Sequence, residues 1–244
     1  MAALNPTPPL RTPLIQTSGL TLHFGGLKAV DGVDFTLHAG EIHALIGPNG
    51  AGKTTFVSLL SGRRLPQSGT IRLAGEDITR LPAHARVRKG IAYTFQITSV
   101  FPRLTVFDNV ALAVQSQGTA DLTAKTHAAL ARVGLDGLEE QEAQTLSYGH
   151  QRLLELAMGL ALNPRLLILD EPTQGLAASE IEGFKTLIRS LVPQTTVLLI
   201  EHNMEVVMDL ATRITVLTFG RVLATGTAAE IRANPAVQEA YLGA

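Results

Sequence analysis

The sequence predicts an α/β fold whose core is a mainly parallel sheet, with an antiparallel β subdomain beside it and an inserted helical subdomain. The first sign of this core is a glycine-rich phosphate-binding loop at residues 47–54, which lies between an apolar strand and a helix. The second sign is the later alternation of continuous apolar strands with helices. We expect a disordered tail over residues 1–15 and one domain over residues 16–244, with the helical insertion at roughly residues 97–160.

Composition narrows the class of protein. The chain has 244 residues, of which 45% are hydrophobic, enough for one large domain with a real core. A net charge of −1 and the absence of any basic run predict no nucleic-acid partner. The chain contains no cysteine, which excludes disulfides and thiolate metal sites and fits the cytosol.

The amino terminus and the apolar runs bear on targeting. The first fourteen residues hold four prolines and lack the basic start and apolar core of a secretory signal, so we interpret them as a disordered tail. The longest apolar runs have the length of strands and end in charged residues. We therefore expect no segment that spans a membrane.

The segment before the phosphate-binding loop predicts the antiparallel β subdomain. Residues 20–24 and 30–37 have the character of short strands around the Gly25-Gly26 turn, and residues 70–73 form a further strand after a turn. Phe24, at the end of the first strand, offers an aromatic face that can stack on a purine, with Val30 packed beside the sugar. The alternative is that Phe24 is an ordinary core phenylalanine.

The phosphate-binding loop reads Gly-Pro-Asn-Gly-Ala-Gly-Lys-Thr and fits the pattern G-x-x-x-x-G-K-[ST]. Its glycines permit turn conformations and close approach to a ligand, and its amides form a nest for anions at a helix amino terminus. Lys53 is expected to reach the β- and γ-phosphates of ATP, and the Thr54 hydroxyl to bind magnesium. The expected ATP contacts in this loop are Gly47, Pro48, Asn49, Gly50, Ala51, Gly52, Lys53, Thr54 and Thr55.

The middle of the chain predicts the helical subdomain and a switch residue at its start. Gln96 closes the apolar strand of residues 91–95, where its amide can touch magnesium or the attacking water and shift when the subdomain rotates. The alternative is a polar residue that merely ends a strand. Alanine and leucine then recur at helical spacing between residues 101 and 146.

A second anion site is expected where the next helix begins. Ser147 and the Gly149 amide precede a helix whose leucines lie on one face. Taken by itself, this segment favours an ordinary serine-capped helix.

The acidic strand end supplies the reacting carboxylates. Residues 166–169 are apolar and are followed by Asp170 and Glu171, which a buried strand delivers to the carboxyl edge of the sheet. Asp170 is expected to hold magnesium through water, and Glu171 to act as general base on the attacking water. A solvated acidic turn is the alternative.

The last third of the chain alternates strand and helix. Residues 196–200 form a strand that leads to His202, which is expected to bond the γ-phosphate or orient the water, unless it is simply a surface histidine. Helices are expected at residues 178–191 and 205–211, and two short ones, broken near Pro235, at residues 228–242.

These motifs, in this order, resemble those of ABC transporter ATPases, and the likeness covers nearly the whole chain beyond the first fifteen residues. It implies the P-loop NTPase fold of ABC ATPases, with residues 146–150 as the signature motif that completes the site of the opposite subunit. Two copies, or this chain and a related ATPase, then enclose two ATP molecules, and water attacks the γ-phosphate in line.

Finer stretches are similar to the branched-chain amino-acid transporter ATPases, notably residues 24–30, 146–149 and 201–208, while residues 96–101 and the chain end also resemble urea-transporter ATPases. The resemblance implies the ATP-hydrolysing subunit of an importer, peripheral on the cytoplasmic face of the inner or plasma membrane. Its partners are transmembrane permease subunits, expected to contact Gln96 and residues 101–110, and indirectly a solute-binding protein.

Three positions depart from the wider family: Tyr148 in the signature, which the branched-chain group shares, His150 in place of glutamine, and Ala177 where aspartate is usual. Ala177 lies in a loop expected to cross the dimer interface, so this change is expected to weaken communication between sites. Two alternatives stay open: a soluble ABC ATPase that remodels DNA or ribosomes, and a nucleotide-binding module without turnover.

Overall fold

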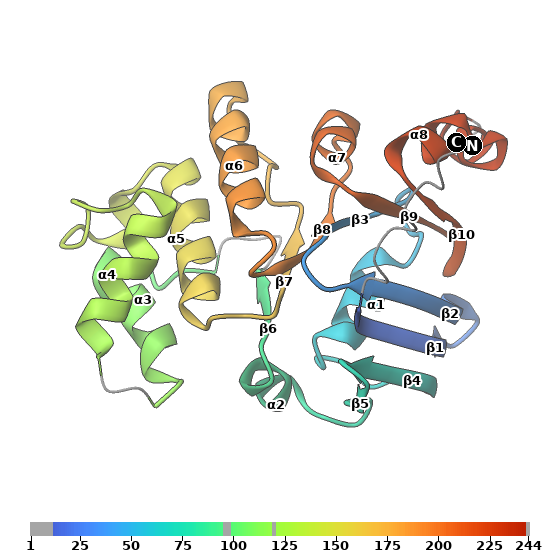
Figure 1. The fold of residues 1–244 in the computed structure, drawn as a ribbon, viewed down its shortest axis with the longest axis horizontal. Helices are drawn as coiled ribbons and strands as arrows, with labels where there is room; N and C mark the ends of the chain where they lie inside the picture. Colours follow the sequence, from blue (N-terminus) through green and yellow to red (C-terminus); the bar gives the residue numbers. More distant parts are fainter. Residues whose placement is uncertain (1–11, 95–98, 119–120, 243–244) are drawn as a thin grey trace, which may run out of the picture.

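The structure is a computed structural model that describes residues 12–94, 99–118 and 121–242. Two β-sheets and a layer of helices make up the molecule (Figure 1). One sheet is antiparallel, the other is mainly parallel, and the helices α3, α4 and α5 lie together at one end. This arrangement confirms the three-part α/β organisation that the sequence predicts.

The antiparallel sheet has the strand order β2-β1-β4-β5. Its hairpin is longer than expected, because β1 and β2 have twelve residues each and β1 starts inside the stretch that we assigned to the tail. Leu14 and Ile15 are buried there, so they have a place in the core that the proline-rich composition did not indicate. The strands are β1 (Pro13–Phe24), β2 (Leu27–His38), β4 (Ser68–Leu73) and β5 (Glu76–Asp77).

The second sheet has the order β10-β9-β3-β8-β7-β6, in which only β10 runs antiparallel to its neighbour. Every residue of β3, β7 and β8 is buried, as expected for central strands covered on both faces. Their bounds are β3 (Ile42–Ile46), β6 (Ile91–Thr94), β7 (Leu166–Asp170), β8 (Thr196–Ile200), β9 (Arg213–Thr218) and β10 (Arg221–Gly226).

The helices begin and end at recognisable residues. The Thr105 side chain accepts from the Asp108 amide at the start of α3, and Gly134 ends α4 in the left-handed conformation. No helix in the described part of the chain is long and apolar enough to cross a bilayer. The helices are α1 (Lys53–Leu60), α2 (Ala83–Arg88), α3 (Val106–Gln115), α4 (Leu122–Val133), a 3-10 turn (Ala143–Thr145), α5 (Tyr148–Ala161), α6 (Ala178–Leu191), α7 (Met204–Leu210), α8 (Ala228–Ala233) and α9 (Pro235–Leu242).

The core fixes the helix that follows the phosphate-binding loop. One apolar cluster joins the parallel sheet to α3–α6, and a second lies between the two sheets and includes four residues of α1. In the second cluster the rings of Phe35 and Phe56 meet edge to face with centroids 5.3 Å apart. Because α1 is packed on this side, its amino terminus is held at the carboxyl edge of β3.

Candidate active site

Three neighbouring parallel strands bring the predicted reacting groups to one edge of the sheet. β3 pairs with β8, β8 pairs with β7, and all three run in the same direction. Lys53 follows β3, Asp170 and Glu171 end and follow β7, and His202 follows β8. Asp170 and Glu171 also lie near enough to Lys53 for their negative charges to act on the pKa of its ammonium group.

The phosphate-binding loop needs glycine at two positions for space as well as conformation. A Cβ on Gly47 would lie 2.2 Å from the Leu217 carbonyl oxygen, and one on Gly52 would lie 2.1 Å from the Ala29 carbonyl oxygen. Both glycines also have positive φ, 152° and 103°. The loop is therefore shaped by backbone contacts with β9 and β2.

The other loop residues of the prediction lie along the same turn. Lys53 Nζ donates to the Gly47 carbonyl at 2.6 Å and to the Pro48 carbonyl at 3.2 Å, which places the ammonium against the loop. Burial lowers the pKa of Lys53, while the two carboxylates act in the opposite direction. Asn49 and Gly50 form an exposed tip, Ala51 is buried, and Thr54 and Thr55 stand in the first turn of α1 with Thr54 exposed.

Arg86 supports α1 from its far end, a role that the sequence did not reveal. It is fully buried, and its guanidinium donates to the carbonyls of Leu59 and Leu60 at 2.6 and 2.9 Å. Further bonds reach the carbonyls of Leu81 and Thr79 at 2.9 and 3.0 Å. A cation at a helix carboxyl terminus complements the helix dipole, and burial lowers the pKa of Arg86 to about 10.

Asp170 has a partner that we did not predict. The Tyr93 hydroxyl donates to Asp170 Oδ2 at 2.8 Å, from the neighbouring strand β6. Burial raises the pKa of Asp170, and the bond from Tyr93 and the charge of Lys53 partly offset that rise. Burial also raises the pKa of Tyr93, so the phenol stays a donor. The sequence signal was weak, because a tyrosine in an apolar strand is usually a packing residue.

Glu171 has a strained backbone at the point where the strand ends. Its φ is +48°, which is uncommon for a residue with a side chain, and its amide donates to the Ile200 carbonyl at 2.8 Å. Glu171 Oε1 lies 3.7 Å from His202 Nδ1, beyond hydrogen-bond distance. The His202 side chain is 59% exposed against 20% for Glu171, so the pair borders open space.

Glu201 is buried, although it is a charged residue directly after β8. It accepts from the Thr173 hydroxyl at 2.5 Å and from the Thr173 amide at 3.0 Å. It also accepts from the amides of His202 and Asn203 at 3.1 and 3.2 Å. This carboxylate therefore ties the loop that carries Glu171 to the loop that carries His202.

The residues predicted for the base and sugar separate in the structure. Phe24 is 40% exposed and borders a hollow with Thr54, Thr55 and Arg64, whose guanidinium is 5.0 Å from the ring centroid. It is therefore not the core phenylalanine of the alternative. Val30 is different: it is completely buried in the core between the sheets and has no exposed surface to place beside a sugar. An apolar residue suits both a protein core and a contact with a sugar, so the sequence did not show which of these two environments Val30 occupies.

Ser147 and Gly149 lie at the amino terminus of α5. Ser147 Oγ accepts from the His150 amide at 3.2 Å, so the serine caps the helix, and its side chain is exposed. A Cβ on Gly149 would lie 2.3 Å from a carboxylate oxygen of Glu180, so this backbone is closely packed against α6. No hydrogen bond or ion pair within the described ranges joins Ser147 to the phosphate-binding loop. Gln96 lies outside the described residues.

A family model described as "ABC transporter" matches residues 30–174. A second, described as "Branched-chain amino acid ATP-binding cassette transporter", matches residues 221–244. Together they cover the phosphate-binding loop, the signature segment, the acidic strand end and the chain end.

Similar full-length proteins carry a consistent description. The chain is 41% identical to the high-affinity branched-chain amino acid transport ATP-binding protein BraF of Pseudomonas aeruginosa, over 95% of this chain and 98% of that protein. It is 40% identical to the protein LivG of Escherichia coli, described in the same words, with the same coverage. A crystal structure described as the ADP conformation of an ATP-binding cassette of an ABC transporter has a TM-score of 0.86 and 26% identity, and the match covers 95% of this chain and 99% of that one.

Proposed function

The chain belongs to the ABC transporter ATP-binding proteins, in their branched-chain amino-acid subfamily, and on this premise we propose how its residues bind and hydrolyse ATP for an importer of branched-chain amino acids. It is an ATPase whose hydrolysis is coupled to transport. The single observation that supports the site is the convergence of Lys53, Asp170, Glu171 and His202 at one sheet edge.

ATP binding follows from the shape of the loop. The amides of residues 47–52 and the amino terminus of α1 attract the phosphates, and Lys53 exchanges its contacts with the Gly47 and Pro48 carbonyls for the β- and γ-phosphates. The exposed ring of Phe24 takes the base, because it lies at the rim of the hollow beside Thr54 and Thr55.

The donor set at the site suits magnesium. The exposed Thr54 hydroxyl and the Asp170 carboxylate are oxygen ligands, which this ion prefers, and the described residues contain no cluster of three histidine or acidic residues that would favour another metal. Tyr93 donates to Oδ2 of Asp170, and within the described ranges no hydrogen bond is found at Oδ1, which would suit a water on the metal. Magnesium, when bound, neutralises charge on the β- and γ-phosphates. The amide of Gln96 completes this set in our proposal.

Each reacting residue then has one task. Glu171 takes a proton from the water whose oxygen bonds the γ-phosphorus, while the bond from the γ-phosphorus to the β–γ bridging oxygen breaks and ADP leaves. The proton stays on the Glu171 carboxyl group. His202 donates to a γ-phosphate oxygen, and its exposed position next to Glu171 suits a group that meets an incoming ligand. Glu201, which is buried, bonds both the loop that carries Glu171 and the loop that carries His202, and so holds them in place.

The signature segment requires a second ATPase subunit. Ser147 is exposed at the amino terminus of α5, and no described contact brings it to the phosphate-binding loop of its own chain. We propose that Ser147 and the Gly149 amide bind the γ-phosphate held by the partner, so that ATP joins two subunits and hydrolysis releases them.

The contact to the membrane subunits is proposed for the groove between α2, β6, α3 and α5. Its lining is mainly apolar, with Val87, Ala113, Met158 and Leu162, and it also includes Ser99. Phe101, two residues after Ser99, is 51% exposed. A short helix of a transmembrane permease subunit suits such a groove. In this proposal the chain is peripheral on the cytoplasmic face of the membrane.

Replacement of Glu171 by Gln tests the site. The variant should lose ATPase activity by about 10²–10⁴-fold, because the base is gone while the shape of the site is kept. It should also form a dimer with ATP that is stable in size-exclusion chromatography. Glu205→Gln, an exposed glutamate two residues beyond Asn203, is the matched control and should behave as wild type. A monomeric variant that hydrolyses ATP at the wild-type rate would overturn the role of Glu171.

The substrate is tested with the membrane subunits that copurify with the chain. Reconstituted in vesicles with their solute-binding protein, they should drive ATP-dependent uptake of labelled leucine, isoleucine or valine. Uptake of urea in place of these amino acids would overturn the substrate and leave the ATPase site standing. Copurification with ribosomes or DNA and no membrane protein would overturn the transport role.

A further inference from the structure

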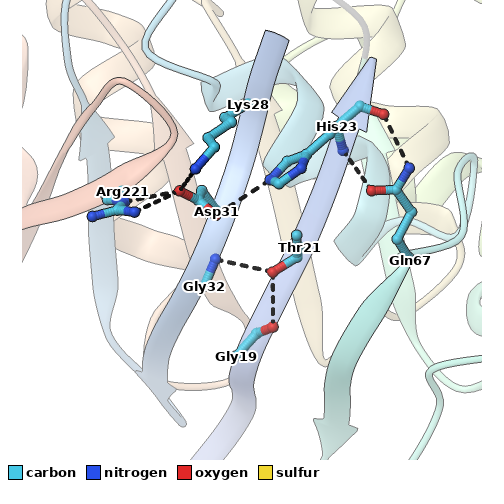
Figure 2. Close-up of polar contacts among 8 residues, drawn as sticks. All are labelled: Gly19, Thr21, His23, Lys28, Asp31, Gly32, Gln67 and Arg221. Carbon is cyan, nitrogen blue, oxygen red and sulfur yellow. Dashed lines mark hydrogen bonds and ion pairs between the residues drawn. The ribbon is translucent and has the colours of Figure 1, made fainter. Parts of the chain in front are cut away.

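One carboxylate joins three segments next to the candidate site. Asp31 Oδ2 accepts from Arg221 Nε at 3.0 Å and from Arg221 Nη2 at 2.7 Å, and Lys28 Nζ lies 3.5 Å away (Figure 2). Asp31 Oδ1 lies 3.2 Å from His23 Nε2. His23 belongs to β1, Lys28 and Asp31 to β2, and Arg221 to β10, so the cluster connects the two sheets.

A bulge in β2 places Asp31 in this position. Leu20 pairs with Val33 and Leu22 with Val30, so β2 has one residue more than β1 over this stretch. Gly32 has a φ of +69°, and its amide donates to the Thr21 hydroxyl at 3.0 Å. Bulges of this kind redirect side chains, and here Asp31 meets β10 of the other sheet (Figure 2).

The same stretch of β2 packs on the phosphate-binding loop through backbone. Gly52 approaches the Ala29 carbonyl so closely that no Cβ fits, and Gly220 has a similar approach to the Lys28 carbonyl, where a Cβ would lie at 2.4 Å. The Asp31 amide donates to the Gly220 carbonyl at 2.8 Å, and the Gly220 amide donates to the Ala51 carbonyl at 3.0 Å. The β9–β10 turn is thus a direct bridge from the loop to the hairpin.

The hairpin end that carries Phe24 is held on its other side as well. The Gln67 side chain accepts from the His23 amide at 2.9 Å and donates to the His23 carbonyl at 3.1 Å (Figure 2). His23 therefore has its backbone fixed by Gln67 and its ring fixed by Asp31. The next residue is Phe24, whose ring borders the hollow beside the phosphate-binding loop.

We propose that Asp31, through its ion pair with Arg221, is a positioning residue that sets the place of the Phe24 ring relative to the phosphate-binding loop and so contributes to recognition of the nucleotide base. This inference rests on the proposed function, in which Phe24 takes the base. Asp31 does not touch the phosphates, and its effect passes through the hairpin.

The ion pair between Asp31 and Arg221 is expected to contribute little to the stability of the fold. The Arg221 side chain is 67% exposed, and exposed ion pairs contribute little to stability. The junction also retains its backbone bonds without the carboxylate. Loss of the charge should therefore leave the fold intact and allow the hairpin end to move relative to the loop, which matters only to a ligand that contacts both.

The test compares a ligand that has a base with one that lacks it. MgADP and magnesium pyrophosphate both bind without a γ-phosphate or a second subunit, so their dissociation constants for Asp31→Asn report on one chain. We expect binding of MgADP to weaken about five- to tenfold, and binding of pyrophosphate to change less than about twofold. Equal losses for both ligands, or no loss for MgADP, would overturn the proposal.

Two further variants check the result for Asp31→Asn. Arg221→Gln removes the other half of the pair at an exposed side chain and should reproduce the selective loss, even if Asp31→Asn fails to fold. Asp34→Asn is the matched control on the same strand, because Asp34 bonds the Gly19 amide at 2.7 Å without reaching β10, and it should bind both ligands as wild type.

Phe24→Ala distinguishes the base contact of Phe24 from the positioning role of Asp31. It should weaken MgADP selectively, and adding Asp31→Asn to it should cause no further selective loss, because both act on the same contact. If Phe24→Ala leaves MgADP binding unchanged, the proposed base contact is wrong. If Phe24→Ala weakens MgADP and neither Asp31→Asn nor Arg221→Gln does, only the positioning role is wrong.

Discussion

The Tyr93 hydroxyl donates a hydrogen bond of 2.8 Å to Asp170, and so joins two neighbouring strands at the point where the carboxylate that we propose for magnesium ends β7. Asp170 is 2% exposed. A buried carboxylate prefers to be neutral, and this bond stabilises its charged form. Tyr93 is therefore expected to keep Asp170 ionised at the pH at which the enzyme works.

Tyr93→Phe tests this relationship without disturbing the ring. Burial already raises the pKa of Asp170 and the Tyr93 bond lowers it, so removal of the hydroxyl should raise that pKa further. The acidic limb of the kcat/KM profile should move to higher pH, and the magnesium concentration at half-maximal rate should rise about threefold. Profiles measured from pH ~5 to ~8 check both. An unchanged acidic limb would contradict the role of the bond.

Arg86→Met should destabilise the chain strongly. The Arg86 guanidinium donates to four carbonyls, two in α1 and two in the β5–α2 segment, and methionine removes all four of these bonds. The Leu59 carbonyl keeps a bond from the Gly62 amide at 3.3 Å. We expect a loss of about 3 kcal/mol in the free energy of unfolding in urea. Arg88→Met, an exposed position of the same helix, is the control. Equal stability of the two variants would show that the four bonds contribute nothing.

His43 should make folding sensitive to acid. It is fully buried, and burial lowers its pKa despite the opposing hydrogen bond with Glu41. Between that lowered pKa and the ordinary value near ~6.5, the unfolded chain binds a proton that the folded chain does not, so stability falls as pH falls through this window. The slope from His43 alone is at most about 1.4 kcal/mol per pH unit.

Urea unfolding at several pH values measures this slope, and His43→Gln should reduce it above pH ~5. Glu41 acts at lower pH. Burial raises its pKa, but hydrogen bonds from His43 and the His38 amide outweigh that effect, so the pKa is lowered overall. Its contribution is present above its unfolded pKa and is lost as pH falls below that value. A His43→Gln slope equal to that of wild type would contradict the prediction.

Ala177→Asp should stabilise α6. Ala177 is the N-cap of this helix, its backbone is extended there, and its methyl group has no oxygen to accept from the first-turn amides. Aspartate supplies that acceptor and a charge that suits the helix dipole, so the free energy of unfolding should rise by about 1 kcal/mol. Ala177→Val, which adds bulk without an acceptor, is the control and should give no gain. Thermal and urea unfolding provide the measurement.

Local sequence patterns were sufficient to predict most of the strands and helices. The continuous apolar runs that lead to Asp170 and His202 are buried parallel strands, and α6 has the bounds expected from its spacing, because period and capping depend on residues close together in the chain. The phosphate-binding loop was evident for the same reason, since its three glycines, lysine and threonine all lie within eight consecutive positions.

Contacts between segments that are far apart in the sequence could not be predicted from such local patterns. Tyr93 and Asp170 are 77 positions apart, and Asp31 and Arg221 are 190 apart, so only the strand order brings them together. Val30 and Phe24 are both apolar and lie six positions apart, yet one is completely buried and the other borders the hollow. Composition and spacing tell which groups a chain contains; which of them meet depends on how the two sheets pack, and that is decided by the whole core together.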